Sequence, residues 1–250
     1  MRAYLTLARR ELASYFLSML GYVIIAAAAF MMGMSFLVMV VNLHGLPTPL
    51  PVTELFYMTP FFWLILLAGA PVITMRLFAL EKFSGTYETL MTTPVSELQV
   101  LMAKFTAAMV FYLLMWLPLL ACLQVLRHFT SEGAGFDPAT IASTFLGILL
   151  IGGMFISLGC CASAVTRNQV IAACLTLGFG VTIFLLGVLG SEVAADTSAR
   201  AQFLSSFALF DHMHDFARGI VDTRPIIFLV SLTLFFLFLT LRILESRRWR

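Results

Sequence analysis

The sequence predicts an all-α, polytopic membrane protein with six transmembrane helices, cytoplasmic termini and an N-terminal amphipathic helix in the membrane interface. Three observations support this prediction. Of the 250 residues, 61% are hydrophobic and only 11% are charged, which leaves too little polar surface to cover a soluble domain. Six apolar stretches are long enough to cross a hydrocarbon core of about 30 Å. The basic residues also fall mainly on one side of the resulting topology.

The six expected spans account for most of the chain. Each is a run of roughly 20 residues that are predominantly apolar, as a transmembrane helix requires. The fourth and fifth spans are separated only by residues 166–168, which predicts a tight hairpin. The spans are expected at Leu20–Val41, Leu55–Met75, Phe105–Leu126, Ala139–Val165, Val170–Gly190 and Pro225–Leu244.

The distribution of lysine and arginine predicts the orientation. An even number of spans puts both termini on one side, and that side carries 11 of the 15 basic residues. Because cytoplasmic loops are enriched in lysine and arginine, the termini are expected in the cytoplasm. The basic residues on that side are Arg2, Arg9, Arg10, Arg76, Lys82, Lys104, Arg167, Arg242, Arg247, Arg248 and Arg250; those on the other side are Arg127, Arg200, Arg218 and Arg224.

The N-terminal segment, residues 1–19, has apolar residues at helical spacing with Arg9, Arg10 and Glu11 between them. This pattern is typical of an amphipathic helix that lies in the plane of the interface. A simple positively charged topology anchor is the plainer interpretation, and the two are compatible. The apolar positions are Leu5, Ala8, Leu12, Tyr15, Phe16 and Met19.

A long segment between the second and third spans, residues 76–104, is expected on the cytoplasmic side. It carries three acids and three bases, a Ser84-Gly85 break and Pro94. We expect an extension of the second span, a turn and a short helix at about Thr86–Met91, followed by the third span. Ser96 and Gln99 have the spacing of a capping box. Such a short helix suits the docking of a soluble partner, although an ordinary interfacial loop fits the pattern as well.

On the other side of the membrane, residues 191–223 form the third long segment outside the spans. Phe203, Phe207, Phe210, Ala217 and Ile220 are spaced as one face of a helix. We expect this aromatic face to pack in the headgroup layer or against the ends of the spans. Gating or partner contact is the alternative.

Several kinds of chemistry are absent from the sequence. The chain has two lysines, Lys82 and Lys104, and neither lies in a phosphate-binding G-x-x-x-x-G-K-[ST] motif. His212 and His214 are two residues apart, which on a helix puts them on different faces, so polar interfacial residues are favoured over a metal site. The expected spans hold essentially no ionisable residue, which disfavours a proton-coupled carrier or an intramembrane protease. No catalytic, cofactor-binding or metal residues are therefore expected.

The cysteines give no further motif. All four lie in apolar runs and lack the spacing of a zinc site or a disulfide framework, so they are interpreted as small core residues. They are Cys122, Cys160, Cys161 and Cys174.

The segment 76–104 resembles a known family. The run that begins at Arg76 resembles the E-x-x-x-G-T-x-E-x-L-x-x-x-P signature of ABC-2 type transporter permeases, whose positions are matched by Glu81, Gly85, Thr86, Glu88, Leu90 and Pro94. The resemblance implies one ABC-2 transmembrane domain over residues 1–250. Within it, residues 1–19 would be the connecting helix, with Arg9, Arg10 and Glu11, and residues 76–104 the segment that couples to an ATPase subunit.

The C-terminal residues 217–224 and 244–249 look closest to the gliding-motility-associated branch of that family. One position departs from the pattern, since Met19 stands where a proline is expected after Ser18. A sharp kink between the connecting helix and the first span is therefore not predicted.

The resemblance implies the permease subunit of an ABC exporter in a bacterial cytoplasmic (inner) membrane. ATP and Mg²⁺ would bind the partner ATPase, so this chain would be neither an enzyme nor a cofactor-binding protein. The expected partners are that ATPase, a second permease copy of the same or another chain, membrane lipid and an extracytoplasmic accessory subunit, but no nucleic acid. A mechanical transmitter, which relays ATPase strokes to an outer partner without moving a substrate, is the alternative. The substrate itself is not predicted.

Overall fold

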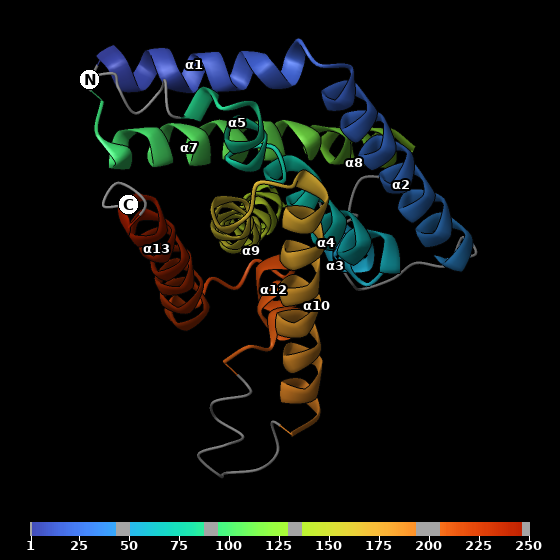
Figure 1. Ribbon diagram of the computed structural model, residues 1–250. Coiled ribbons are helices and arrows are strands. Elements are labelled where there is room, and N and C mark those ends of the chain that lie inside the picture. The colour runs from blue at the N-terminus through green and yellow to red at the C-terminus, as the bar shows by residue number, and fades with distance from the viewer. Residues whose placement is uncertain (1, 44–50, 88–94, 130–136, 194–205, 247–250) are drawn as a thin grey trace.

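The computed structural model describes residues 2–43, 51–87, 95–129, 137–193 and 206–246, and every regular element in these ranges is a helix (Figure 1). The predicted all-α fold is therefore confirmed, while the cytoplasmic orientation of the termini stays a prediction. Among the described residues, six segments are long and apolar enough to cross a membrane, as predicted. They are Met19–Asn42, Pro60–Ser84, Glu97–His128, Pro138–Val165, Gln169–Gly190 and Thr223–Ser246.

Two spans are built differently from the prediction. The second begins at Pro60, not Leu55, because α3 (Val52–Tyr57) is a separate short helix that ends before α4 (Pro60–Thr74). Pro60 occupies the first turn of α4, where its missing N–H leaves no helical bond unmade. The third span begins about two turns before Phe105, at Glu97, because the predicted capping box of Ser96 and Gln99 is present.

The third span is also interrupted near its middle. α7 (Glu97–Met115) ends at Trp116, and α8 (Leu117–Phe129) follows at once. Pro118 explains the break, because its ring carries no N–H and clashes with the carbonyl four residues earlier. The buried side chain of Trp116 anchors this joint in the core, with its ring centroid 5.1 Å from that of Phe62.

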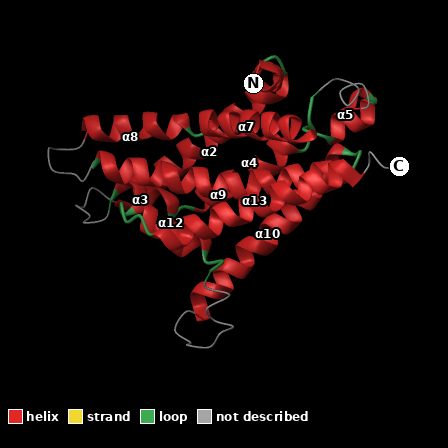
Figure 2. Ribbon diagram, turned by 90° about the vertical axis from the view of Figure 1, so that its left-hand side faces the viewer, coloured by secondary structure: helices red, strands yellow, loops and turns green. Residues whose placement is uncertain are grey.

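The predicted N-terminal helix is α1 (Arg2–Phe16), which packs mainly on α7. Figure 2 shows it nearly end-on while α8, α9 and α13 are seen lengthwise, so it lies across the spans. The chain then turns into α2 (Met19–Leu43). A sharp change of direction, which the sequence did not predict, is therefore present between α1 and α2 (Figure 1). Gly21 allows the turn without a proline, because a Cβ there would overlap the carbonyl oxygen of Tyr15.

The centre of the bundle is α9 (Pro138–Val165), which Figure 1 shows end-on between its neighbours. Of its most apolar window, 78% is buried, against 17–28% for the spans of α2, α10 (Gln169–Val193) and α13 (Thr223–Ser246). α13, α10 and α4 pack directly on α9. The tight hairpin between α9 and α10 is present, and Asn168 Oδ1 accepts a hydrogen bond from Val170 N at 2.9 Å.

Short helices lie at both ends of the bundle. α5 (Ala79–Ser84) and the C-terminal end of α13 lie at one end, which we call the α5 end; α3 and α12 (Leu209–Ala217) lie at the other, the α3–α12 end (Figure 2). The face that α12 buries consists of Leu209, Met213, Phe216 and Ala217. It differs from the predicted face, since Ile220 lies beyond the helix and is 56% exposed. Phe203 lies outside the described residues.

Candidate functional site

The structure brings two of the sequence-predicted groups together at the α5 end. Arg9, Arg10 and Glu11 lie on α1, and Glu81 lies on α5. Arg76 is in the turn that joins α4 to α5, and Gly85 ends α5 in a left-handed conformation, with φ of 73°. Thr86 follows it. Glu88 and Pro94, which complete the predicted motif, lie outside the described residues, as does most of the expected helix at 86–91.

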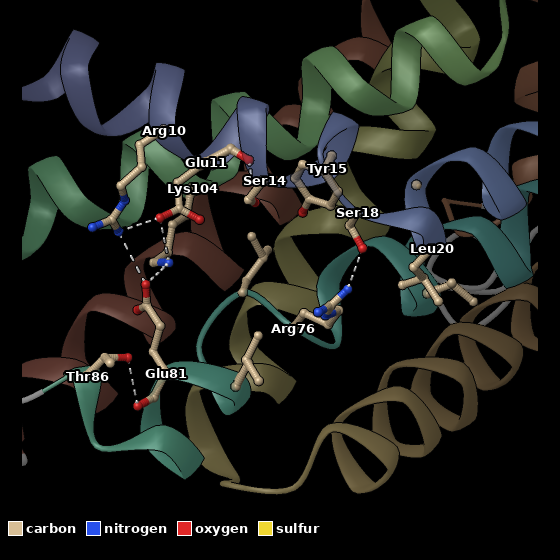
Figure 3. Close-up of a pocket in the computed structure, with 14 residues that line it drawn as sticks. Arg10, Glu11, Ser14, Tyr15, Ser18, Leu20, Arg76, Glu81, Thr86 and Lys104 are labelled. Atoms are coloured by element: carbon tan, nitrogen blue, oxygen red, sulfur yellow. Dashed lines mark hydrogen bonds and ion pairs between the residues drawn. The ribbon is translucent and has the colours of Figure 1, made fainter.

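Four charged side chains form what we call the Lys104 cluster: Arg10 and Glu11 from α1, Glu81 from α5 and Lys104 from α7. Lys104 Nζ lies 2.8 Å from Glu81 Oε1 and 3.1 Å from Glu11 Oε1. Arg10 Nη2 lies 2.7 Å from Glu11 Oε1 and 3.4 Å from Glu81 Oε1. Two cations and two carboxylates thus link α1 to α5 and α7, which come much later in the chain (Figure 3).

Burial makes the central cation the critical member of this cluster. The Lys104 side chain is 2% exposed, whereas that of Arg10 is 53% exposed. A buried ammonium group is stable only when it is paired, and here it has two carboxylates and lies 5.4 Å from the centre of the Phe78 ring. The hydrogen bond with Glu11 raises the pKa of the Arg10 guanidinium, so Arg10 stays charged.

Sequence reasoning missed Lys104, which we had expected just outside the third span. The structure corrects this, since the helix starts at Glu97 and Lys104 lies two turns inside it. The signal was present, because the capping box at Ser96 fixes the helix start. Because α7 packs on both α1 and α9, the residues of its second turn are buried.

α5 is anchored on the end of α9. Ser163 Oγ accepts hydrogen bonds from the backbone N–H groups of Phe78 and Ala79, both at 3.1 Å. The buried Lys82 donates to the carbonyl oxygen of Ala164. Movement of α5 therefore cannot occur without movement of the central helix or loss of these bonds.

A cavity of about 400 Å³ lies between α1, α5 and the turn into α2. Figure 3 shows the Lys104 cluster on one side of it and Arg76, Ser18 and Leu20 on the other. Glu81 Oε2 is buried beside the cavity, and no described residue donates a hydrogen bond to it. Glu81 therefore retains acceptor capacity that the described residues leave unused.

A second charged cluster lies at the α3–α12 end, and we call it the Glu54 cluster. Arg218 Nε and Nη2 donate to the two carboxylate oxygens of Glu54 at 2.9 and 2.8 Å. His214 Nε2 lies 3.3 Å from Glu54 Oε1. The Glu54 side chain has no exposed surface, and the bidentate contact raises the pKa of Arg218. Thr53 Oγ1 also donates to the carbonyl of Ala217, so α3 and α12 are held together twice.

The two predicted histidines have different partners. His214 faces Glu54, while His212 Nε2 lies 3.1 Å from the carbonyl oxygen of Ser206. Among the described residues, no three His, Cys, Asp or Glu side chains are grouped so that they could hold a metal ion.

The six spans and the helix that crosses their ends indicate a multi-pass membrane protein. A family model described as "ABC-2 family transporter protein" matches residues 39–242, about four-fifths of the chain. The chain therefore belongs to the ABC-2 transporter family, as the permease component of an ABC transporter and not its ATPase. The match identifies the family and does not distinguish the gliding-motility branch. A search of curated proteins finds no match.

Proposed function

We propose that this chain is the permease subunit of an ABC-2 exporter in a bacterial cytoplasmic membrane. In this proposal two permease subunits form the translocation unit, and a separate ATPase, which binds ATP and Mg²⁺, docks at the α5 end. That end would face the cytoplasm, because it carries most of the lysine and arginine residues. Arg76, Glu81, Gly85, Thr86, Glu88 and Pro94 would form the docking segment, and α1 would be the connecting helix.

The Lys104 cluster is the observation that supports this proposal best. A force on the segment after α4 acts on Glu81, whose partner Lys104 also holds Glu11 of α1. The same helix that carries Lys104 packs on α9. A push from a docked ATPase would thus reach α1, the third span and the central helix through one buried cation. Switching between two packings of these helices would then open the unit to one side or the other.

A tilt of the spans would require one end of the bundle to stay together while the other end moves. The Glu54 cluster holds α3 to α12 at the opposite end, where α12 packs on both α9 and α10. An extracytoplasmic accessory subunit would bind at this end. The mechanical-transmitter alternative uses the same two ends and differs only in moving no substrate.

The decisive test is the charge reversal Glu88→Lys in the docking segment. The tagged chain is purified with its ABC ATPase from native membranes, and ATP hydrolysis of the complex is compared with that of the ATPase alone. Glu88→Lys is expected to lower the stimulated hydrolysis while membrane insertion stays normal. Glu245→Lys is the matched control, because Glu245 is a carboxylate near the C-terminal end of α13 whose side chain is 39% exposed and outside the docking segment.

Equal stimulation by Glu88→Lys and by the unchanged chain would overturn the assignment of the docking segment. Failure to recover any ABC ATPase with the chain would overturn the proposal of a separate ATPase. Normal hydrolysis by a complex that moves nothing across liposomes, but that binds an outer partner, would favour the transmitter. Membership of the gliding-motility branch stays a prediction from the C-terminal residues, of which 247–250 lie outside the described ranges.

A further inference from the structure

We propose that the cavity at the α5 end and an adjoining groove between α2 and α4 together bind one anionic phospholipid. The phosphate-bearing headgroup would lie at Arg76, and an acyl chain would follow the groove toward the middle of the spans. The inference does not depend on the proposed coupling to an ATPase, because it rests on the shape and charge of this region alone.

The polar half of the site has an uncompensated positive charge. Five charged residues line the cavity, three of them basic: Arg10, Lys104 and Arg76. Arg10 and Lys104 are neutralised by Glu11 and Glu81. Arg76 differs, because the described residues give it no carboxylate and only one hydrogen bond, from Nη1 to Ser18 Oγ at 3.1 Å.

An arginine in this setting suits a phosphate group. The planar guanidinium has five N–H donors, and it pairs with phosphate oxygens through two of them at once. Ser14, Ser18 and Thr86 also line the cavity. Ser18 Oγ accepts from Arg76 and keeps its own O–H for a ligand, whereas Ser14 Oγ donates to the carbonyl oxygen of Glu11 and Thr86 Oγ1 to that of Glu81. A bound headgroup would bridge the α1–α2 turn, at Ser18, and the end of α4, at Arg76.

The apolar half of the site is continuous with this cavity. Leu20 and Val72 line both the cavity and a groove of about 180 Å³ between α2 and α4. All residues of the groove are apolar; Ile24, Ala28, Ile65 and Met115 form part of its wall. A polar compartment thus leads directly into an apolar one, and the boundary lies where the chain passes from α1 into the first span.

This continuity favours a lipid over a free phosphate ion. Soluble phosphate would occupy only the polar compartment and leave the groove in contact with the bilayer. α2 presents much of its surface to the outside, with only 28% of its span window buried, so the groove can be reached laterally from the membrane. A basic residue at the interface attracts anionic headgroups, and the apolar chain gains by burial.

The test uses native mass spectrometry of the delipidated full chain in detergent. Phosphatidylglycerol and phosphatidylcholine with identical acyl chains are added in turn, and inorganic phosphate is added as a competitor. The unchanged protein is expected to bind one phosphatidylglycerol about fivefold more tightly than phosphatidylcholine, as one interfacial charge provides. Arg76→Gln should remove this preference, and Arg76→Lys should keep most of it.

Two further variants make the result specific. Arg242→Gln removes a basic residue near the C-terminal end of α13 that pairs with Glu245 and does not line the cavity, so it should keep the preference. Ala27→Phe fills the groove from the exposed side of α2, and should weaken the binding of both lipids. Thermal unfolding of each variant establishes that it is folded.

Three results would overturn the proposal. The first is an equal loss of preference in Arg76→Gln and Arg242→Gln, which would indicate nonspecific attraction. The second is full displacement of the lipid by millimolar inorganic phosphate, which would indicate an anion site without a chain site. The third is a change in oligomeric mass with Ala27→Phe while lipid binding stays constant, which would assign the groove to a second copy of the chain.

Discussion

The two ends of the bundle each contain a buried charge, but they bury opposite signs. In the Lys104 cluster the buried member is a cation, 2% exposed, shared between two carboxylates on two different helices. In the Glu54 cluster it is a carboxylate with no exposed surface, held by a bidentate contact from one arginine. Both clusters join helices that are remote in the sequence.

The difference lies in how completely each cluster is satisfied. Both oxygens of Glu54 accept hydrogen bonds from Arg218, and the short contact between Thr53 and Ala217 closes the same joint. Glu81, in contrast, keeps one oxygen that no described residue reaches, beside a cavity of about 400 Å³. A closed bidentate pair fixes one arrangement, whereas a shared cation beside open space permits partner exchange. The α3–α12 end is therefore held in one arrangement, whereas the α5 end can change its ion-pair partners.

The largest effect is expected from Lys104→Met. It leaves Glu11 and Glu81 facing each other with only the half-exposed Arg10 between them, and breaking a buried ion pair costs about 3–5 kcal/mol. Equilibrium unfolding in mixed micelles measures the loss. Adding Glu81→Gln to Lys104→Met should recover part of it, because the repulsion is relieved; two additive losses would contradict the idea of a shared cation.

Glu54→Gln should have the second largest effect. The amide keeps one acceptor oxygen but loses the charge and the second acceptor, so the bidentate charge-assisted pair is lost at a cost of about 2 kcal/mol. Arg218 can turn toward solvent because its side chain is 42% exposed. The same unfolding experiment measures this loss. The losses of Glu54→Gln and Lys104→Met should add, since the clusters lie at opposite ends of the bundle. A large coupling energy between them would show that the two ends do not behave independently.

Two glycines allow the same comparison of the two ends, with a smaller expected loss of stability. Gly85 and Gly219 both have positive φ, 73° and 85°, and one lies at each end of the bundle. Gly85→Ala should cost only the left-handed strain, about 1 kcal/mol, because a Cβ there meets open space. Gly219→Ala should cost more, because its Cβ would lie 2.9 Å from Thr140 Oγ1. Equal shifts in thermal unfolding would contradict tighter packing at the α3–α12 end.

The smallest effect is expected from Arg10→Gln. Arg10 is 53% exposed, and exposed ion pairs contribute less than about 1 kcal/mol. Stability measured by thermal unfolding should therefore change little at moderate salt. A loss as large as that of Lys104→Met would show that Arg10, and not Lys104, is the critical cation of the cluster.

The elements that were predictable from the sequence are those with local causes. The apolar runs locate all six spans, Ser96 and Gln99 fix the start of α7, and the residues between Arg2 and Met19 identify α1. The resemblance names Glu11 and Glu81 separately, in the connecting helix and in the coupling segment. Their position at one site was not predicted, because nothing local joins α1 to α5.

The unpredicted parts depend on contacts between distant residues. In the sequence, Glu54 is an ordinary acid near the start of an expected span. Its burial depends on the pairing with Arg218, 164 residues later. From the sequence, Lys104 lies at the membrane boundary. It becomes a buried residue only because α1 packs across α7. The bend at Gly21 had no motif either, because what requires a glycine there is the approach of the Tyr15 carbonyl in space.

The central position of α9 has a consequence for biogenesis. α9 is buried on nearly all sides, and α13, one of its principal neighbours, follows it in the chain with α10 and α12 between them. Until α13 has been synthesised and inserted, one side of α9 lacks its native cover. The hydroxyl groups of Ser143, Thr144 and Ser157 already bond to carbonyls of α9 itself, each within four residues. These hydrogen bonds within α9 leave few polar groups unsatisfied while the helix lies in lipid and α13 has not yet packed on it.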